Sequence, residues 1–239
     1  MSMMKEGLSI ILPTYNERET IARLIQKIIE VLSSMVLDLE IIVVDDSSPD
    51  GTAQAVKKSF AEKPFVKVIQ RKETPSLGAS VKEGILASSK NLILMMDTDF
   101  NHSPLDIPRF LASLERAQVV NGSRFIRGGG MEKAPLRYLG SRFFNFICRK
   151  ILGLRVTDIL SGFLLVRRSD LLSLELETIF TGYGDFAIRF HQTAKKKGWS
   201  VLEIPVHYPR RLGGHSKTKF FKHACQYFRA AIKARLFIK

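Results

Sequence analysis

Short runs of apolar residues alternate with amphipathic segments through the first half of this 239-residue chain. The runs are rich in Ile and Val, which is typical of buried strands, and they cover residues 8–12, 40–44, 66–70, 92–96 and 119–120. Between them, apolar residues recur every three to four positions and predict helices over residues 20–32, 52–60, 78–88 and 104–117. Strands that alternate with helices in this way predict an α/β fold with a mostly parallel sheet.

The pattern changes after Arg124. A glycine-rich loop at residues 128–130 precedes a predicted helix over 135–152 and a strand over 163–166. A second helix is expected over 186–197 and a further strand over 201–206. Because no low-complexity linker or internal repeat divides the chain, we expect the second half to complete the sheet of the first half.

A last helix is predicted over residues 217–236, in a segment without acidic residues. No Asp or Glu follows Glu203, whereas nine Lys or Arg do. A helical wheel places apolar side chains on one side and basic ones on the other: Phe220, Phe221, Ala224, Phe228, Ala231 and Ile232 against Lys222, Arg229 and Lys233. Such a helix suits a membrane interface, and it equally suits packing of its Phe face against the domain.

Composition narrows the class of protein. The chain has 37 Lys and Arg against 23 Asp and Glu, a formal charge of +14, which favours an anionic partner such as nucleic acid, nucleotide or lipid headgroup. Cys148 and Cys225 form no Cys-x-x-Cys pair, so we expect reduced thiols, in keeping with a cytosolic setting. With no apolar run of about 18 residues and no signal-peptide core, neither a membrane span nor a leader is expected.

Polar motifs follow three of the predicted strands, where doubly wound sheets bind nucleotides. They are Pro13-Thr14-Tyr15-Asn16-Glu17, Asp45-Asp46-Ser47-Ser48-Pro49-Asp50-Gly51-Thr52 and Asp97-Thr98-Asp99-Phe100-Asn101. Each alone could be a turn with a helix cap. Together they would bring four carboxylates to one sheet edge, where like charges repel unless a cation compensates them. Asp97, Asp99 and Asn101 offer hard oxygen ligands for Mg²⁺ or Mn²⁺ bridging a diphosphate.

These motifs resemble family 2 of the glycosyltransferases, whose GT-A fold begins with a Rossmann-like nucleotide-binding sheet. Further motifs are similar to the polyprenyl-phosphate (dolichyl-phosphate) mannosyltransferase group, and the similarity runs from about residue 8 to residue 220. They are Gly122-Ser123-Arg124-Phe125, Arg137 with Ser141 and Asn145, Asp158-Ile159-Leu160-Ser161-Gly162-Phe163, and Arg211-Leu212-Gly213-Gly214-His215-Ser216-Lys217. This chain departs from the family at Ser76 and Lys133, where the family has Gly and an aromatic residue, and these departures weaken the resemblance in the exact substrate. In the stretch 181–186 the acid Asp185 stands one position away from the family's polar residues, which leaves the sugar open.

The resemblance implies a role for each motif. The nucleoside would be held by Pro13, Tyr15, Glu17, Asp45 and Asp46, and the metal, diphosphate and sugar by Asp97, Asp99 and Asn101. Phosphate of the lipid acceptor or donor would be bound by Arg124, Arg137, Ser141, Arg211 and Lys217. It further implies a metal-dependent catalytic domain over residues 1–216, followed by the basic helix over 217–239. Asp97, Asp99 and Asp185 are the expected catalytic carboxylates.

The implied reaction is inverting transfer of a hexose from a nucleotide sugar, with GDP-mannose as the first choice, to a polyprenyl phosphate. We expect it at a membrane surface, in a cytoplasmic protein peripheral on the cytosolic face. Some family members use a membrane-anchored partner protein, and the sequence leaves the need for one open. An acceptor phosphate needs no general base, so Asp185 is expected to orient a sugar hydroxyl or an arginine, unless it only caps the helix that follows.

Alternatives are a UDP-glucose-type donor, or a saccharide hydroxyl acceptor with Asp185 as the base. A nucleic-acid-binding protein is the alternative of another class. It is disfavoured because the carboxylates at the strand ends would repel phosphate and aromatic residues are not interleaved with the basic ones.

Overall fold

A seven-stranded sheet forms the centre of the computed structural model, which describes residues 7–35, 37–132, 135–209 and 220–237. The strand order is β3-β2-β1-β4-β7-β5-β8. The strands are β1 (Gly7–Thr14), β2 (Asp38–Asp45), β3 (Val66–Gln70), β4 (Leu92–Met95), β5 (Val119–Ser123), β7 (Leu164–Arg167) and β8 (Val201–Pro205). All neighbours pair in parallel except β7, which runs antiparallel to both β4 and β5. The mostly parallel α/β sheet expected from the sequence is confirmed, and the second half of the chain does complete it.

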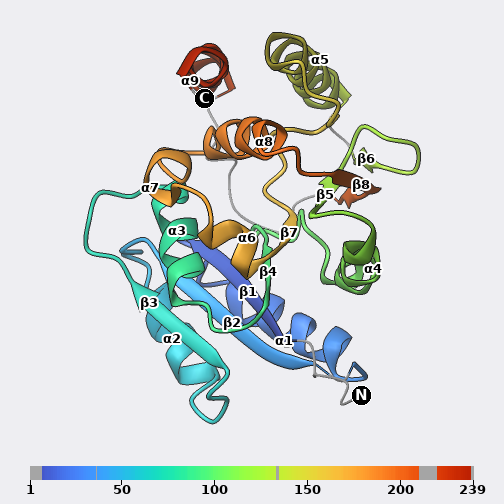
Figure 1. Cartoon of the computed structure of the whole chain (residues 1–239). Helices are drawn as coiled ribbons and strands as arrows, with labels where there is room; N and C mark the ends of the chain where they lie inside the picture. Colours follow the sequence, from blue (N-terminus) through green and yellow to red (C-terminus); the bar gives the residue numbers. More distant parts are fainter. Residues whose placement is uncertain (1–6, 36, 133–134, 210–219, 238–239) are drawn as a thin grey trace.

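Helices cover both faces of this sheet (Figure 1). One face packs against α1 (Ile21–Leu32), α2 (Thr52–Ser59) and α4 (Ile107–Ser113). The other packs against α3 (Leu77–Ala87), α6 (Arg168–Leu172), α7 (Leu176–Ile179) and α8 (Phe186–Lys196). Successive side chains of β1 alternate between the two faces, as a strand buried on both sides requires: Ile10 packs on the side of α1 and Ile11 on the side of α3.

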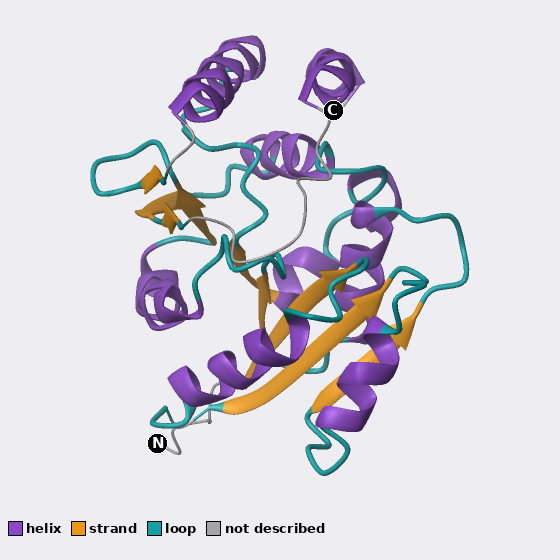
Figure 2. Cartoon of the chain, turned by 180° about the vertical axis from the view of Figure 1, so that it is seen from behind, coloured by secondary structure: helices purple, strands orange, loops and turns teal. Residues whose placement is uncertain are grey.

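A third layer lies beyond α8 and holds α5 (Pro135–Leu152) and α9 (Phe220–Phe237). Figures 1 and 2 both show these two helices at one end of the molecule, beyond α8 and away from β3. Small side chains allow close packing here, because Ala230, Ala231 and Ala234 are buried in a cluster with Cys148 of α5 and Ile188 of α8. The thiol of Cys148 is free and buried, and burial raises its pKa to about 12.

Three expectations need correction. The helix predicted over 104–117 is broken into the 3-10 turn η1 (Pro104–Asp106), α4 and the 3-10 turn η2 (Leu114–Arg116). Pro108 near the start of α4 has no amide hydrogen, so it begins a helix better than it continues one. A two-stranded sheet of β6 (Gly130–Met131) and β9 (His207–Tyr208) was not expected either.

The third correction concerns α9. The wheel placed Phe228 and Ile232 on the packing side with Ala231, but only the alanine is buried. Phe228 is 42% exposed and Ile232 is 39% exposed, because the row of alanines fits closer to α5 and α8 than large side chains could. The side chains of residues 220–226, including Phe220, Phe221 and Ala224, lie outside the described residues.

Candidate active site

The carboxyl ends of β1, β2 and β4 open onto one cavity of about 450 Å³. Its lining includes most of the residues singled out in the sequence: Pro13, Tyr15, Glu17, Asp46, Asp97, Asp99, Asn101, Arg124, Arg137 and Ser141. Asp45 and Asp185 are buried beside the cavity and do not line it. Arg211 and Lys217 lie outside the described residues. A cavity of this size suits a nucleotide-sized ligand.

Each of the three loops after these strands contains a residue with unusual backbone geometry. Asn16 has φ 55°, Ser47 has φ 57° and Phe100 has φ 61°. Residues other than glycine seldom adopt this left-handed conformation, and it tends to persist at functional sites where the surrounding structure enforces it. The three loops that follow these strands therefore share a constrained backbone conformation.

Asp45 supports its own loop. Its carboxylate accepts hydrogen bonds from the backbone and the hydroxyl of Ser48, at 3.1 and 2.5 Å, and from Thr14 Oγ1 at 3.2 Å. The side chain is wholly buried. These contacts join the ends of β1 and β2 and hold the loop that presents Asp46.

Asp46 does line the cavity, and its charge is compensated by a residue that the sequence did not single out. Arg71, at the end of β3, forms a buried ion pair with Asp46 and a second one with Glu83 at 2.7 Å. Burial opposes the charge of Arg71, but Glu83 and Asp46 hold its pKa above the ordinary value. Asp46 also accepts a hydrogen bond from the amide of Ser76 at 2.5 Å. The expected crowding of carboxylates is thus partly relieved by an arginine.

The loop after β4 presents oxygen ligands. Asn101 donates from its backbone to Asp99 Oδ1 at 3.1 Å and from its side-chain amide to Asp99 Oδ2 at 2.7 Å. Asp97, whose side chain is 44% exposed, lines the same cavity. Among the described residues, no group of three or more His, Cys, Asp or Glu could hold a metal ion alone. Two carboxylates and an amide oxygen fit a Mg²⁺ or Mn²⁺ ion that takes its other ligands from substrate phosphates and water.

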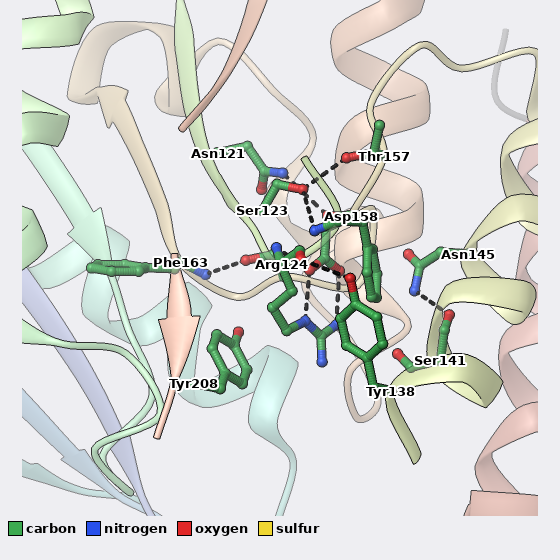
Figure 3. A network of polar contacts seen from close by, with 12 residues as sticks. Asn121, Ser123, Arg124, Tyr138, Ser141, Asn145, Thr157, Asp158, Phe163 and Tyr208 are labelled. Atoms are coloured by element: carbon green, nitrogen blue, oxygen red, sulfur yellow. Dashed lines mark hydrogen bonds and ion pairs between the residues drawn. The ribbon is translucent and has the colours of Figure 1, made fainter. Parts of the chain in front are cut away.

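Arg124 reaches the cavity from the end of β5 and is held by Asp158 (Figure 3). Its Nε and Nη2 donate to the two carboxylate oxygens of Asp158 at 2.7 and 2.8 Å, and its backbone amide donates at 3.1 Å. Burial opposes the charge, but Asp158 outweighs it and keeps the pKa of Arg124 above its ordinary value. Asp158 belongs to a motif that the sequence flagged without giving it a role.

The face of the Arg124 guanidinium lies against the ring of Tyr208, 4.8 Å from its centroid. Tyr208 is a further cavity residue that the sequence did not suggest. Burial raises the pKa of its hydroxyl, so the group stays protonated. Its position depends on the short strand β9, which no hydrophobic pattern predicted.

The first half of α5 forms another wall. Arg137 and Ser141 line the cavity, and Tyr138 between them donates from its hydroxyl to the backbone oxygen of Arg124 at 3.3 Å. One turn later, Asn145 donates to the backbone oxygen of Ser141 at 2.8 Å. The hydrogen bond from Tyr138 to the Arg124 backbone joins α5 to the loop after β5. Arg124 and Arg137 therefore line the same cavity.

Asp185 precedes α8 and forms an ion pair with Arg189 Nη1 at 2.6 Å. Its carboxylate also accepts from the amide of Tyr183 at 3.0 Å. No hydrogen bond from the start of α8 reaches its side chain, so it is not a capping side chain in the usual sense. The contacts brace the loop whose Tyr183 and Gly184 line the cavity.

A family model and several known relatives point to the same protein family. Residues 9–174 match the family described as "Glycosyl transferase family 2". The undecaprenyl-phosphate mannosyltransferase of Micrococcus luteus is 33% identical over 87% of this chain and 85% of its own length. The polyprenol monophosphomannose synthase of Mycolicibacterium smegmatis is 32% identical over 87% and 79%. The dolichol-phosphate mannosyltransferase of Pyrococcus furiosus is 34% identical over 89% of this chain, which spans only 59% of that protein.

Solved structures agree on the fold. The glucosyl-3-phosphoglycerate synthase of Mycobacterium tuberculosis bound to UDP has a TM-score of 0.71 with 22% identity, covering 96% of this chain and 80% of its own. The complex of that enzyme with Mn²⁺, UDP-glucose and phosphoglyceric acid has a TM-score of 0.70 with 23% identity, covering 96% and 79%. With this GT-A architecture and these relatives, the chain belongs to glycosyltransferase family 2.

Proposed function

We propose that this protein transfers mannose from GDP-mannose to a polyprenyl phosphate, at the cytosolic face of a membrane. The observation that carries the proposal is the meeting of two chemistries in one cavity. Asp97 and Asp99 offer oxygen ligands to the cavity, and Arg124 and Arg137 line the same cavity. Carboxylates suit a metal-bound diphosphate, and arginines suit a second phosphate. The names of the relatives support mannose as the sugar and a polyprenyl phosphate as the acceptor.

An exposed apolar surface supports a lipid acceptor. It consists of the solvent-facing large side chains of α5 and α9: Leu136, Leu139, Phe143, Phe146, Phe228, Ile232 and Leu236. No helix in the described part of the chain is long and apolar enough to cross a membrane. We infer that this surface enters the interface of the bilayer, with exposed Lys150, Arg229 and Lys233 near the anionic headgroups. The lipid phosphate would then reach the cavity past Ser141 of α5 and Tyr227 of α9, which line it.

In the proposed reaction, a phosphate oxygen of the acceptor attacks the anomeric carbon of the sugar. The bond from that carbon to the diphosphate breaks, its electron pair leaves with the nucleoside diphosphate, and the configuration inverts. The acceptor phosphate is already ionised at neutral pH, so no side chain has to remove a proton. Asp185, held by Arg189, is suited to bracing the Tyr183 loop and less to acting as a base.

The protein's own groups supply position and charge. Arg124, fixed by Asp158, and Arg137 would orient the acceptor phosphate for in-line attack. Tyr15, Glu17 and Asp46 would hold the nucleoside at the ends of β1 and β2. A Mg²⁺ or Mn²⁺ ion bound by Asp97, Asp99 and Asn101 would neutralise the charge that develops on the leaving diphosphate. We further propose that residues 1–216 act as the catalytic domain and residues 217–239 as its membrane-facing helix.

The test offers purified protein a panel of labelled nucleotide sugars, including GDP-mannose and UDP-glucose, with a short polyprenyl phosphate and Mg²⁺ or Mn²⁺. We expect mannose label in the organic phase only when the phosphate and a divalent ion are present. The matched control is the same polyprenol without its phosphate. Transfer of label from UDP-glucose instead would show that GDP-mannose is not the donor. Transfer to the free polyprenol or to saccharides would show that the acceptor is not a polyprenyl phosphate.

A further inference from the structure

A buried histidine and tyrosine connect the loop of Asp97 with Arg124. His102 is wholly buried, and its ring stacks on Phe163 with the centroids 4.7 Å apart. Its Nε2 lies 2.7 Å from the hydroxyl oxygen of Tyr208. These two residues are 106 positions apart in the chain, and Tyr208 lines the cavity.

The backbone determines where the histidine carries its proton. The amide of Asp97 donates to His102 Nδ1 at 2.8 Å, so Nδ1 must offer a lone pair. A neutral imidazole with a bare Nδ1 carries its hydrogen on Nε2. His102 Nε2 therefore donates to the hydroxyl oxygen of Tyr208.

This direction leaves the proton of the Tyr208 hydroxyl available. Among the described residues, His102 is the one hydrogen-bond partner of that hydroxyl, and it occupies a lone pair rather than the proton. Tyr208 is only 7% exposed, yet it lines the cavity and packs its ring beneath the Arg124 guanidinium. A buried hydroxyl proton without an acceptor is costly, and a ligand in the cavity would remove that cost.

We propose that Tyr208 is a substrate-binding residue whose hydroxyl donates a hydrogen bond to a phosphoryl oxygen in the cavity, and that His102 is the positioning residue that sets this direction. Tyr208 lines the same cavity as Asp97 and Arg124, and the Arg124 guanidinium lies 4.8 Å from the centre of its ring, which points to a phosphoryl group as the ligand. The phosphoryl group belongs either to the donor diphosphate or to the acceptor phosphate. Both sources would present the same phosphoryl oxygen to Tyr208. Only the identity of the two substrates rests on the proposed function.

The first experiment replaces Tyr208 with Phe, which keeps the ring on Arg124 and removes only the hydroxyl. We expect kcat/KM to fall by about 10- to 100-fold, as for loss of a hydrogen bond to a charged group. Thermal stability should fall modestly, because the buried Nε2–H of His102 loses its acceptor. A rise in KM for the nucleotide sugar alone assigns the contact to the donor, and a rise for the polyprenyl phosphate alone assigns it to the acceptor. The control is Ser88→Ala, which removes a buried hydroxyl that donates to the Ile85 backbone oxygen and does not line the cavity.

The second experiment tests whether His102 acts through Tyr208. His102→Asn keeps an oxygen near Nδ1 for the Asp97 amide and removes the donor to Tyr208. If the positioning role is right, His102→Asn and Tyr208→Phe lower kcat/KM by less in combination than the product of their separate effects. A purely structural role would make the two effects multiply and would overturn the role of His102. If the Asn variant does not fold, Tyr208→Phe still tests the substrate contact.

Direct binding separates failure of this inference from failure of the proposed function. Calorimetry with GDP or UDP and Mn²⁺, and with a short polyprenyl phosphate in detergent, needs no turnover. Weaker binding of either ligand by Tyr208→Phe supports the contact even if the wild type transfers no sugar. Equal affinity for all of these ligands, together with kcat/KM within about twofold of wild type where transfer occurs, would overturn it.

Discussion

Arg124 has two sets of donors with different tasks. Nε and Nη2 each donate one hydrogen bond to the buried carboxylate of Asp158, and the residue also lines the cavity, where its remaining N–H donors are available to a substrate. Because the ion pair is buried, loss of either partner would leave an uncompensated charge, and the arginine is held in place before substrate arrives. Such preorganised charge is what a site needs when it binds an anion without a general base.

At the residue scale, we predict that Asp99→Ala abolishes transfer and leaves the fold intact. Asp99 holds Asn101 through two hydrogen bonds and would contribute a ligand to the divalent ion. Turnover with labelled sugar and a circular dichroism melt measure the two effects. EDTA should stop the wild type equally, and full activity in either the variant or the chelated enzyme would remove the metal from the mechanism.

A second prediction at this scale concerns Arg137 on α5. Arg137→Ala should raise KM for the polyprenyl phosphate by about 10- to 100-fold, since a hydrogen bond to a charged phosphate contributes roughly 1.5 to 3 kcal/mol. Affinity for the nucleoside diphosphate, measured by calorimetry, should change far less. Arg142→Ala is the matched control, because Arg142 is exposed on the same helix and does not line the cavity. Equal effects of the two substitutions would argue against a specific acceptor contact.

At the scale of elements, Glu40 shows how strand β2 is joined to its surroundings. Its buried carboxylate accepts from Ser9 Oγ at 2.6 Å, from the Ser89 amide at 2.9 Å and from Lys67 Nζ at 2.6 Å. Burial alone would raise the pKa of Glu40, but the hydrogen bonds from Lys67, Ser9 and Ser89 outweigh it and lower the pKa to about 2. The residue therefore ties β1, β3 and the turn before β4 to one strand.

This lowered pKa predicts how stability depends on pH. Since the folded pKa lies below the ordinary value of 4.5, the stabilisation is complete above pH 4.5 and is lost as pH falls towards 2. Glu40→Gln should lower the free energy of unfolding by on the order of 2 kcal/mol at pH 7, and the difference from wild type should shrink below pH 4.5. Urea unfolding at several pH values measures both.

The control for this prediction is Glu30→Gln on α1. Glu30 and Lys27 form an exposed ion pair at 3.2 Å, which should contribute less than about 1 kcal/mol. A Glu40 variant that differs from wild type by a constant amount between about pH 7 and pH 3 would contradict the role of its charge.

At the scale of the whole molecule, the cavity and the exposed apolar surface of α5 and α9 lie together. Phe144 of α5 and Tyr227 of α9 line the cavity, and their rings are 6.2 Å apart. The outer sides of the same two helices expose the large apolar residues (Figures 1 and 2 show the two helices at one end). One pair of helices would thus contact the lipid surface and form part of the wall around the reacting phosphate.

We predict that Phe143→Ser combined with Phe146→Ser weakens binding to anionic vesicles by at least about tenfold, because burial of each large apolar side chain contributes about 1.5 to 3 kcal/mol. Both side chains are half or more exposed on α5, so the fold should persist. Sedimentation with vesicles at graded salt measures the loss. The matched control replaces Leu86 of α3 and Leu105 of η1 with Ser, two leucines exposed outside this surface. If the double Ser variant and the wild type bind vesicles equally, another face of the protein contacts the membrane.

Much of the architecture was predictable because it depends on the spacing of apolar residues along short stretches of the chain. Alternation of buried strands with amphipathic helices predicted the order of elements, and α5 was predicted with the observed bounds, Pro135–Leu152. The placement of Asp46, Asp97 and Asp99 at one cavity also follows from a general property, since parallel strands end at the same edge.

Other features depend on which segments, far apart in the sequence, pack against each other. The spacing of apolar residues within one segment does not determine these contacts. The antiparallel insertion of β7 between β4 and β5, the pairing of Asp46 with Arg71 and the contact of His102 with Tyr208 all join segments remote in sequence. The same holds for α9, where helical periodicity alone could not tell whether its alanines or its large apolar residues would face α5 and α8. The sequence by itself therefore determined the elements, their order and the edge that carries the chemistry. Only the tertiary structure decided the partners of each charge and the outward face of each helix, because burial and hydrogen bonding are properties of the packed chain.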